Sequence, residues 1–185
     1  MMNDIVNKKE ADGMNRREQL TLELREDIGT AILELMRAKP LEKITVDELS
    51  AKANVGRATF YRQFSSKQEA ISYKLNQDWQ KFIMKNKINF ETTPPLDYSK
   101  KFFEFLYSLR DINKLLTDNN CKYCIFDAMR YSFENINEKT NKKEYYHDHF
   151  RAYGLLGLVE GWMDANYDMS VDEMAKLAVE YFYKV

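Results

Sequence analysis

The chain has 185 residues and a mass of 22.0 kDa, which is enough for one or two small domains. Hydrophobic residues make up 44% and charged residues 31%, as in ordinary globular proteins, and the 6 glycines and 3 prolines are too few for a turn-rich β fold. Lys and Arg number 28 and Asp and Glu 29, so the formal net charge of −1 excludes a polycation that coats nucleic acid through bulk charge.

The N-terminal segment carries no sign of export or membrane insertion. Its first twenty residues are mostly polar and charged, and no run in the chain approaches the roughly 18 consecutive apolar residues of a membrane span. We therefore expect a cytoplasmic protein. Residues 1–17 are predicted to form a flexible tail, which is either a solvated segment or a basic arm that contacts phosphate. Its basic residues are Lys8, Lys9, Arg16 and Arg17.

Apolar periodicity and start and stop signals predict helices along the whole chain, with loops over Ile88–Pro95 and Asn137–Lys143. In chain order the helices run from Leu24 to a stop at Pro40, from Thr45 to Ala53, from Gly56 to Phe64, from Ser66 toward Lys87, around Phe102–Leu109, over Asn113–Thr117, Cys121–Asn135 and Glu144–Ala165, and from Ser170 to Phe182. Three of these starts are capping boxes, at Thr45–Glu48, Ser66–Glu69 and Ser170–Glu173. No strand alternation stands out, so the predicted fold class is all-α.

The segment from Ile44 to Phe64 predicts a helix-turn-helix, in which two short helices are joined by a tight turn. Leu49, Val55 and Phe60 supply apolar contacts that fix the angle between the helices. The second helix would then project outward, and its short length and polar surface suit the major groove of DNA.

Local charge supports this interpretation more than the total does. Residues 49–68 contain four basic side chains and no Asp or Glu, so this segment has a charge of +4. The four are Lys52, Arg57, Arg62 and Lys67. Arginine can pair with guanine edges, while Thr, Tyr and Lys commonly hold phosphates. The alternative is that these are ordinary exposed helix charges.

Residues 18–75 resemble the N-terminal part of the TetR family of bacterial transcriptional regulators. The shared pattern consists of Thr45, the turn Ala53–Gly56, the segment Thr59–Phe64 and the helix start Ser66–Glu69. Two positions depart from the pattern: Asn54 stands where a turn glycine is usual, and Gln63 where a histidine is usual.

The resemblance implies a three-helix DNA-binding domain over residues 18–66 and a helical regulatory and dimerisation domain over residues 67–185. It implies a homodimer on a near-palindromic, double-stranded DNA operator. By position, the implied DNA contacts are phosphate contacts from Thr45, Thr59, Tyr61 and Lys67, contacts to bases or adjoining backbone from Arg57, Ala58 and Arg62, and a contact from Gln63 to phosphate or adenine.

The helix predicted over residues 144–165 contains three glycines, each of which costs about 0.8–1.0 kcal/mol relative to Ala. A second helix packed very close would compensate for this cost, either inside one chain or in a dimer. Together with the last predicted helix, this segment resembles the two-helix dimer face of the TetR family. The predicted interface comprises Gly154, Gly157, Leu158, Gly161, Trp162, Met174, Ala178 and Tyr181.

Aromatic residues of the C-terminal half form either plain core or the wall of a pocket for a small apolar or aromatic ligand. The candidates are Phe103, Tyr107, Tyr123, Phe126, Met129 and Tyr131. The pair Cys121 and Cys124 permits a metal or thiol-sensing hypothesis, but a structural zinc normally takes four ligands, so we expect two ordinary, partly buried cysteines. No cofactor, metal site or catalytic constellation is predicted, and we do not expect an enzyme.

The leading hypothesis is a dimeric, sequence-specific DNA-binding regulator, specifically a repressor controlled by a small ligand in the C-terminal domain. One alternative is an activator or co-activator that acts with a partner protein. The other is a helical small-molecule carrier with a vestigial DNA-binding domain. The positive charge of the recognition segment argues against the carrier.

Overall fold

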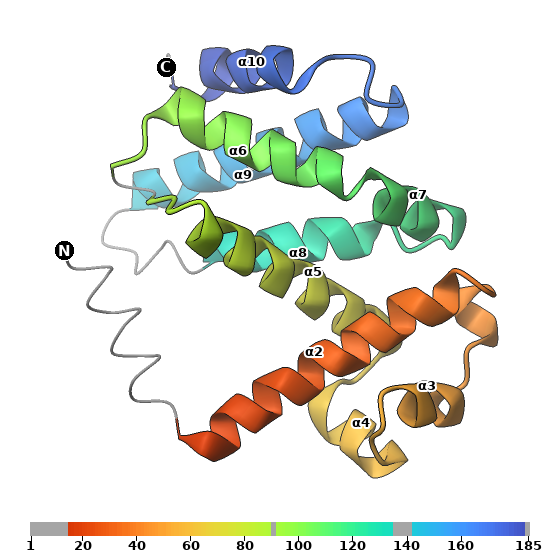
Figure 1. The fold of residues 1–185 in the computed structure, drawn as a ribbon. Coiled ribbons are helices and arrows are strands. Elements are labelled where there is room, and N and C mark those ends of the chain that lie inside the picture. The colour runs from red at the N-terminus through yellow and green to blue at the C-terminus, as the bar shows by residue number, and fades with distance from the viewer. Residues whose placement is uncertain (1–14, 90–91, 135–141, 184–185) are drawn as a thin grey trace. The chain divides into compact units, whose positions relative to one another are not determined.

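A computed structural model describes residues 15–89, 92–134 and 142–183. These residues form helices and no strand, which confirms the predicted all-α fold class (Figure 1). The elements are α2 (Arg16–Met36), the short 3₁₀ helix η1 (Leu41–Lys43), α3 (Val46–Lys52), α4 (Arg57–Gln63), α5 (Lys67–Lys85), α6 (Pro95–Ser108), α7 (Arg110–Asp118), α8 (Tyr123–Glu134), α9 (Lys142–Asp164) and α10 (Val171–Tyr183). None of the described helices is long and apolar enough to cross a membrane.

The chain divides into two compact units, one up to Gln77 and one from Asp78 onward. The division falls inside α5, whereas the predicted domain boundary lies between residues 66 and 67, at the start of this helix. At the other end, α2 begins at Arg16 behind a capping box of Asn15 and Glu18. Arg16 and Arg17, which we expected in the tail, therefore form the first turn of α2.

Unit 1 is built against one face of α2. Ile28 and Ile32 are fully buried on this face, and η1 and α3 pack against the helix. The two short helices contribute Leu49 and Phe60 to the core, with 0% and 1% of their surface exposed. The apolar residues predicted on one side of the first helix and those predicted for the helix-turn-helix thus pack together in one small core.

At Gly29, α2 comes very close to α5. A Cβ atom placed on Gly29 would lie 2.5 Å from the Cβ of Lys74 and 3.0 Å from the carbonyl oxygen of Ala70. The Ala70 oxygen is part of the α5 backbone and the Lys74 Cβ is bonded to it, so neither atom can move away without the helix. The absence of a side chain at position 29 therefore sets how closely the two helices pack.

Unit 2 has α6 packed along α10, with α9 also in contact with α8 and α10 (Figure 1). Its interior is rich in stacked and edge-on aromatic rings, because α6 places aromatic residues at helical spacing along one side. The ring of Trp79 contacts those of Phe82, Phe102 and Phe105 at centroid distances between 5.1 and 5.8 Å. The ring of Phe103, also on α6, lies 5.4 Å from that of Trp162.

Several predicted boundaries in this unit are corrected by the structure. The predicted loop ended at Pro95, but Pro95 is the first residue of α6, where a proline fits because its missing N–H would have no helical partner. The helix predicted over Asn113–Thr117 extends over Arg110–Asp118. Residues 137–141 of the second predicted loop lie outside the described residues, whereas Lys142 and Lys143 belong to α9.

Four of the helices end with a left-handed residue that is not glycine. Asn54, Lys87, Asn120 and Asn166 have φ angles between 52° and 54°. In each case the next residue donates its N–H to the carbonyl five positions back, and the left-handed residue to the carbonyl three back, which is the Schellman motif. Asparagine adopts this conformation more readily than most residues. It therefore takes the place of the glycine that usually follows a helix end, and the chain contains few glycines although it is largely helical.

Candidate nucleic-acid interface

The turn between α3 and α4 is built by backbone hydrogen bonds around Asn54. The N–H of Val55 donates to the carbonyl of Ser50 at 2.9 Å, and the N–H of Asn54 donates to that of Ala51 at 3.2 Å. Asn54, which stands where a turn glycine is usual, has a φ of 52°, the left-handed conformation that asparagine adopts more readily than most residues. Gly56, the predicted start of the second helix, is the N-cap of α4 and has an extended backbone. This turn fixes the direction in which α4 leaves α3.

The buried side of α4 anchors it to the core of unit 1. Phe60 and the C-capping residue Phe64 are 1% and 2% exposed, with ring centroids 6.3 Å apart. The guanidinium of Arg25, from α2, lies 4.9 Å from the Phe64 ring and 3.9 Å from the Tyr73 ring. Arg25 therefore braces the end of α4 against α2 and α5, a role that no sequence motif indicates.

The opposite side of α4 is open to solvent. Arg57, Ala58, Tyr61 and Arg62 are exposed, while Thr59 and Gln63 are half-buried at its edges. Residues spaced by one, four and five positions share one side of a helix, so the four exposed residues form a continuous surface, here called the α4 face. All the residues that we predicted as DNA contacts on this helix thus lie on the α4 face or at its border.

Thr45 performs the capping role expected of it. Its hydroxyl accepts a hydrogen bond from the N–H of Glu48 at 3.2 Å, and the Glu48 carboxylate accepts from the Thr45 N–H at 3.0 Å. The Lys39 ammonium beside it and these bonds to Thr45 lower the pKa of Glu48 to about 2. Thr45 is exposed, so the cap leaves its side chain at the surface.

The positive charge of the recognition segment is partly neutralised by neighbours. Lys52 forms an ion pair with Glu34 of α2 at 2.8 Å, and Arg57 with Asp47 of α3 at 3.3 Å. Within the described part of the chain, Arg62 is the one basic residue of the four with neither an ion pair nor a hydrogen bond. A count over residues 49–68 alone misses both acidic partners.

Lys67, at the start of α5, is engaged with the backbone instead of standing free. Its Nζ donates to the carbonyl oxygens of Leu41 and Ile44 at 2.6 and 2.7 Å, and partial burial lowers its pKa. These bonds tie α5 to the segment that precedes α3. Two of the three ammonium N–H groups are used in these bonds, and the third is available to another acceptor.

Comparison with known families agrees with this geometry. Residues 28–71 match the family described as bacterial regulatory proteins, tetR family. This segment is a TetR-family helix-turn-helix domain. It includes α3, the turn and α4, and TetR-family domains of this kind belong to DNA-binding regulators. No curated protein matches the chain.

Beyond the TetR domain, the residues predicted for a dimer interface fall into two groups. Trp162, Met174 and Ala178 are between 1% and 3% exposed, because they pack into the core of unit 2. The indole N–H of Trp162 donates to the carbonyl of Met169 at 2.9 Å. These three side chains are covered within one chain and offer no surface to a second copy.

The other predicted interface residues are accessible. A Cβ atom on Gly157 or Gly161 would have no neighbour within 4 Å, and Tyr181 is 60% exposed. Gly154 and Leu158 are half-buried. Close packing inside one chain, which the sequence left open as the reason for these glycines, is therefore not what surrounds Gly157 and Gly161.

The predicted pocket residues also divide. Phe103 and Met129 are buried, and Phe103 is covered by the rings of Phe102 and Trp162. Tyr107 and Tyr123 are 41% and 48% exposed, and Phe126 is half-buried. The side chain of Tyr131 lies outside what the structure describes. Phe103 and Met129 thus behave as core residues.

The two cysteines are buried thiols that form no disulfide, with 1% and 0% of their surface exposed. A hydrogen bond with Cys124 lowers the pKa of the Cys121 thiol. Among the described residues, no group of three or more His, Cys, Asp or Glu side chains could hold a metal ion.

Proposed function

We propose that the protein is a dimeric, sequence-specific transcriptional regulator of the TetR type, and that it represses transcription until a small ligand releases it from DNA. The observation that supports this most is the α4 face. It presents Arg57, Ala58, Tyr61 and Arg62 on a helix whose other side is anchored by two buried phenylalanines. Residues that must enter a groove in one orientation need such a rigid support.

The proposed contacts divide by chemistry. Arg57 and Arg62 are the candidates for guanine edges, because a guanidinium can donate two hydrogen bonds to one base. Thr45, Thr59, Tyr61 and Lys67 are proposed as phosphate contacts, with Lys67 limited to its one remaining N–H. Ala58 would approach a base or backbone, and Gln63 a phosphate or an adenine. Phosphate contacts set position and base contacts set specificity.

The proposed dimer uses the open side of α9 with α10. Tyr146, Phe150 and Tyr153 on α9 are between 61% and 73% exposed, and the same helix continues to Gly157 and Gly161. Exposed apolar side chains of this size favour an interface. The glycines would let a helix of a second copy approach closely. Two α4 helices in a symmetric dimer would read the two halves of a near-palindromic operator.

The regulatory domain is proposed over residues 67–185. Its ligand would be apolar or aromatic, because aromatic side chains are frequent in this part of the chain. Such a regulator would act in the cytoplasm, where the DNA is. Transcription from a template with the operator over the promoter distinguishes repression from activation by the sign of the change when the protein is added.

Selection from a random pool of DNA duplexes tests the DNA-binding function. The wild-type protein should enrich an inverted repeat, bind it more weakly as salt rises, and discriminate it from unrelated DNA. Arg57→Ala should cost about 1–3 kcal/mol of operator binding and flatten the preference at one base pair of each half-site. Fluorescence anisotropy measures both quantities.

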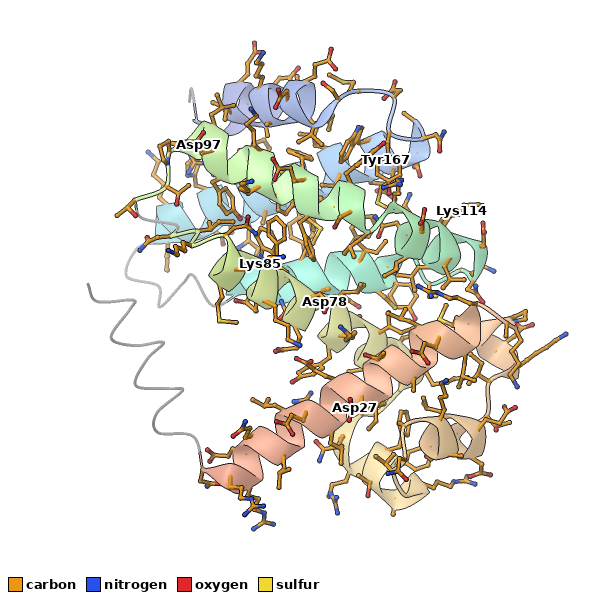
Figure 2. All side chains as sticks on the ribbon, in the orientation of Figure 1. Asp27, Asp78, Lys85, Asp97, Lys114 and Tyr167 are labelled. Atoms are coloured by element: carbon orange, nitrogen blue, oxygen red, sulfur yellow. The ribbon has the colours of Figure 1, made fainter. Side chains whose placement is uncertain are left out.

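The matched control is Lys114→Ala, which removes one positive charge from α7 (Figure 2). This variant should bind the operator as the wild type does. If the wild-type protein enriches no sequence and its binding to duplex DNA is insensitive to sequence, the proposed function is wrong and the carrier hypothesis gains support.

A further inference from the structure

Asp47 of α3 lies beside Arg57, the first residue of the recognition helix. The Nη1 group of Arg57 donates to the two carboxylate oxygens of Asp47 at 3.3 and 3.5 Å. The same guanidinium lies 5.8 Å from the centroid of the Tyr61 ring, one turn along α4. Asp47 and Tyr61 thus hold the Arg57 side chain from two sides.

Arg57 needs a compensating charge at this position. It is the first residue of α4, where the helix macrodipole disfavours a cation, and the first turn of α4 contains no acidic residue. Asp47 lies in the first turn of α3, where a carboxylate is favoured, and the capping box at Thr45 fixes this turn. The carboxylate that faces Arg57 is therefore supplied by the neighbouring helix.

We propose that Asp47 is a positioning residue for base recognition: it orients the Arg57 guanidinium toward a base edge and keeps it from neighbouring phosphates. This inference rests on the proposed DNA-binding function. Arginine has five N–H donors in a planar fork, and Asp47 occupies only the Nη1 group. The Nε and Nη2 edge remains for the O6 and N7 atoms of a guanine.

The negative charge of Asp47 allows an effect on sequence discrimination to be distinguished from an effect on overall DNA affinity. A carboxylate near the DNA backbone repels phosphates, so Asp47 itself makes binding to any duplex less favourable. Without it, the Arg57 side chain is free to turn to a phosphate, which any sequence provides. Loss of Asp47 should therefore weaken discrimination between sequences without weakening binding to unrelated DNA.

The test compares Asp47→Asn with the wild-type protein on three kinds of duplex: the selected operator, the operator with single base-pair changes, and an unrelated sequence. Both side chains of the ion pair are more than half exposed, at 62% and 70%. Because such pairs contribute little energy, we expect the preference at the base pair that Arg57→Ala identifies to fall about two- to fivefold. Preferences at the other base pairs should stay unchanged, and affinity for unrelated DNA should stay equal or rise. The melting temperature should fall by no more than about 4 °C, because Asp47 also favours the first turn of α3.

Two further variants isolate the mechanism. Asp27→Asn removes the same charge from an exposed position on α2 and should leave every preference unchanged (Figure 2). In a background of Arg57→Ala, Asp47→Asn should have no further effect on base preference, since its target is gone. A uniform loss of affinity on all sequences, or an unchanged preference at the base pair that Arg57 contacts, would overturn the inference. Failure of the wild type to select any sequence would instead overturn the proposed function.

Discussion

Gly29 shows how one position determines the packing of unit 1. A methyl group there would meet the Lys74 Cβ at 2.5 Å and the Ala70 carbonyl at 3.0 Å, and neither atom can move without α5. Overpacking of this kind costs about 1–3 kcal/mol, and it exceeds the gain of about 1 kcal/mol in helix propensity from Gly to Ala. The contact between the two helices therefore depends on the glycine.

We predict that Gly29→Ala lowers the free energy of unfolding by up to about 2 kcal/mol, the overpacking cost less the propensity gain. Urea denaturation followed by circular dichroism measures the change. Thr30→Ala, at the exposed neighbour in α2, serves as the control and should change stability by no more than about 0.5 kcal/mol. A more stable Gly29→Ala protein would show that α2 and α5 are less closely packed than described.

The candidate site also shows which residue properties local sequence can predict. The α4 face was predictable, because its exposed positions follow from the helical period and the buried Phe60. The partners of its charges were not, because Glu34 and Asp47 reach Lys52 and Arg57 from other helices. The close contact at Gly29 was also predictable. A glycine inside a helix lowers stability relative to Ala unless close packing compensates, which is the argument that we applied to the glycines of α9.

At the scale of elements, the helix starts that a capping box marks at Thr45, Ser66 and Ser170 were predicted to within one residue, whereas α2 and α6 begin seven or eight residues before the predicted Leu24 and Phe102. The capping boxes at Thr45 and Ser170 are present with both reciprocal hydrogen bonds, because they join residues three positions apart. At the predicted capping box Ser66–Glu69, only one of the two reciprocal bonds is present. The Ser66 hydroxyl accepts from the Glu69 N–H at 3.0 Å, but the Glu69 carboxylate accepts from the N–H of Ser65 and not from that of Ser66. Among the left-handed residues that follow helix ends, Asn54 is recognisable from its residue type, whereas nothing in the sequence marks Lys87.

We predict that Lys87→Gly raises the free energy of unfolding by about 0.5–1 kcal/mol. Lys87 ends α5 with a φ of 53°, which costs a residue with a Cβ roughly 1–2 kcal/mol and costs glycine almost nothing. Part of this gain is lost to the greater freedom of glycine in the unfolded chain. Lys81→Gly, inside the same helix, should lower stability by about 1 kcal/mol. The opposite signs, measured by chemical denaturation, distinguish a left-handed helix end from a position inside the helix.

For the whole molecule, the near-zero net charge and the proposed DNA binding are compatible because charge is arranged locally. The acidic side chains Glu34 and Asp47 offset part of the positive charge near the recognition helix, while Arg62 is left without such a partner among the described residues. Binding by a few well-placed cations favours specificity over bulk attraction. With so few cations on one recognition helix, the proposed function depends on the proposed dimer, which would place two such helices on one operator.

The proposed dimer leads to a prediction at Gly157, which lies on the open side of α9 with no neighbour within 4 Å of an added Cβ. Gly157→Leu should prevent dimerisation, because a large side chain would fill the space that a second helix occupies. Light scattering should then report the monomer mass, and operator affinity should fall with it. If α9 faced only solvent, Leu would instead raise stability through helix propensity and leave the mass unchanged.

Gly157→Ala provides the matched comparison for this prediction. Within one chain its methyl group is accommodated, so a monomer would gain up to about 1 kcal/mol of stability from helix propensity. In a closely packed dimer the same methyl group meets the partner helix and should weaken the association, though less than Leu does. A graded loss of dimer from Gly to Ala to Leu, with helix content kept in all three proteins, places Gly157 at the interface. A dimer of equal stability in all three proteins places the interface elsewhere.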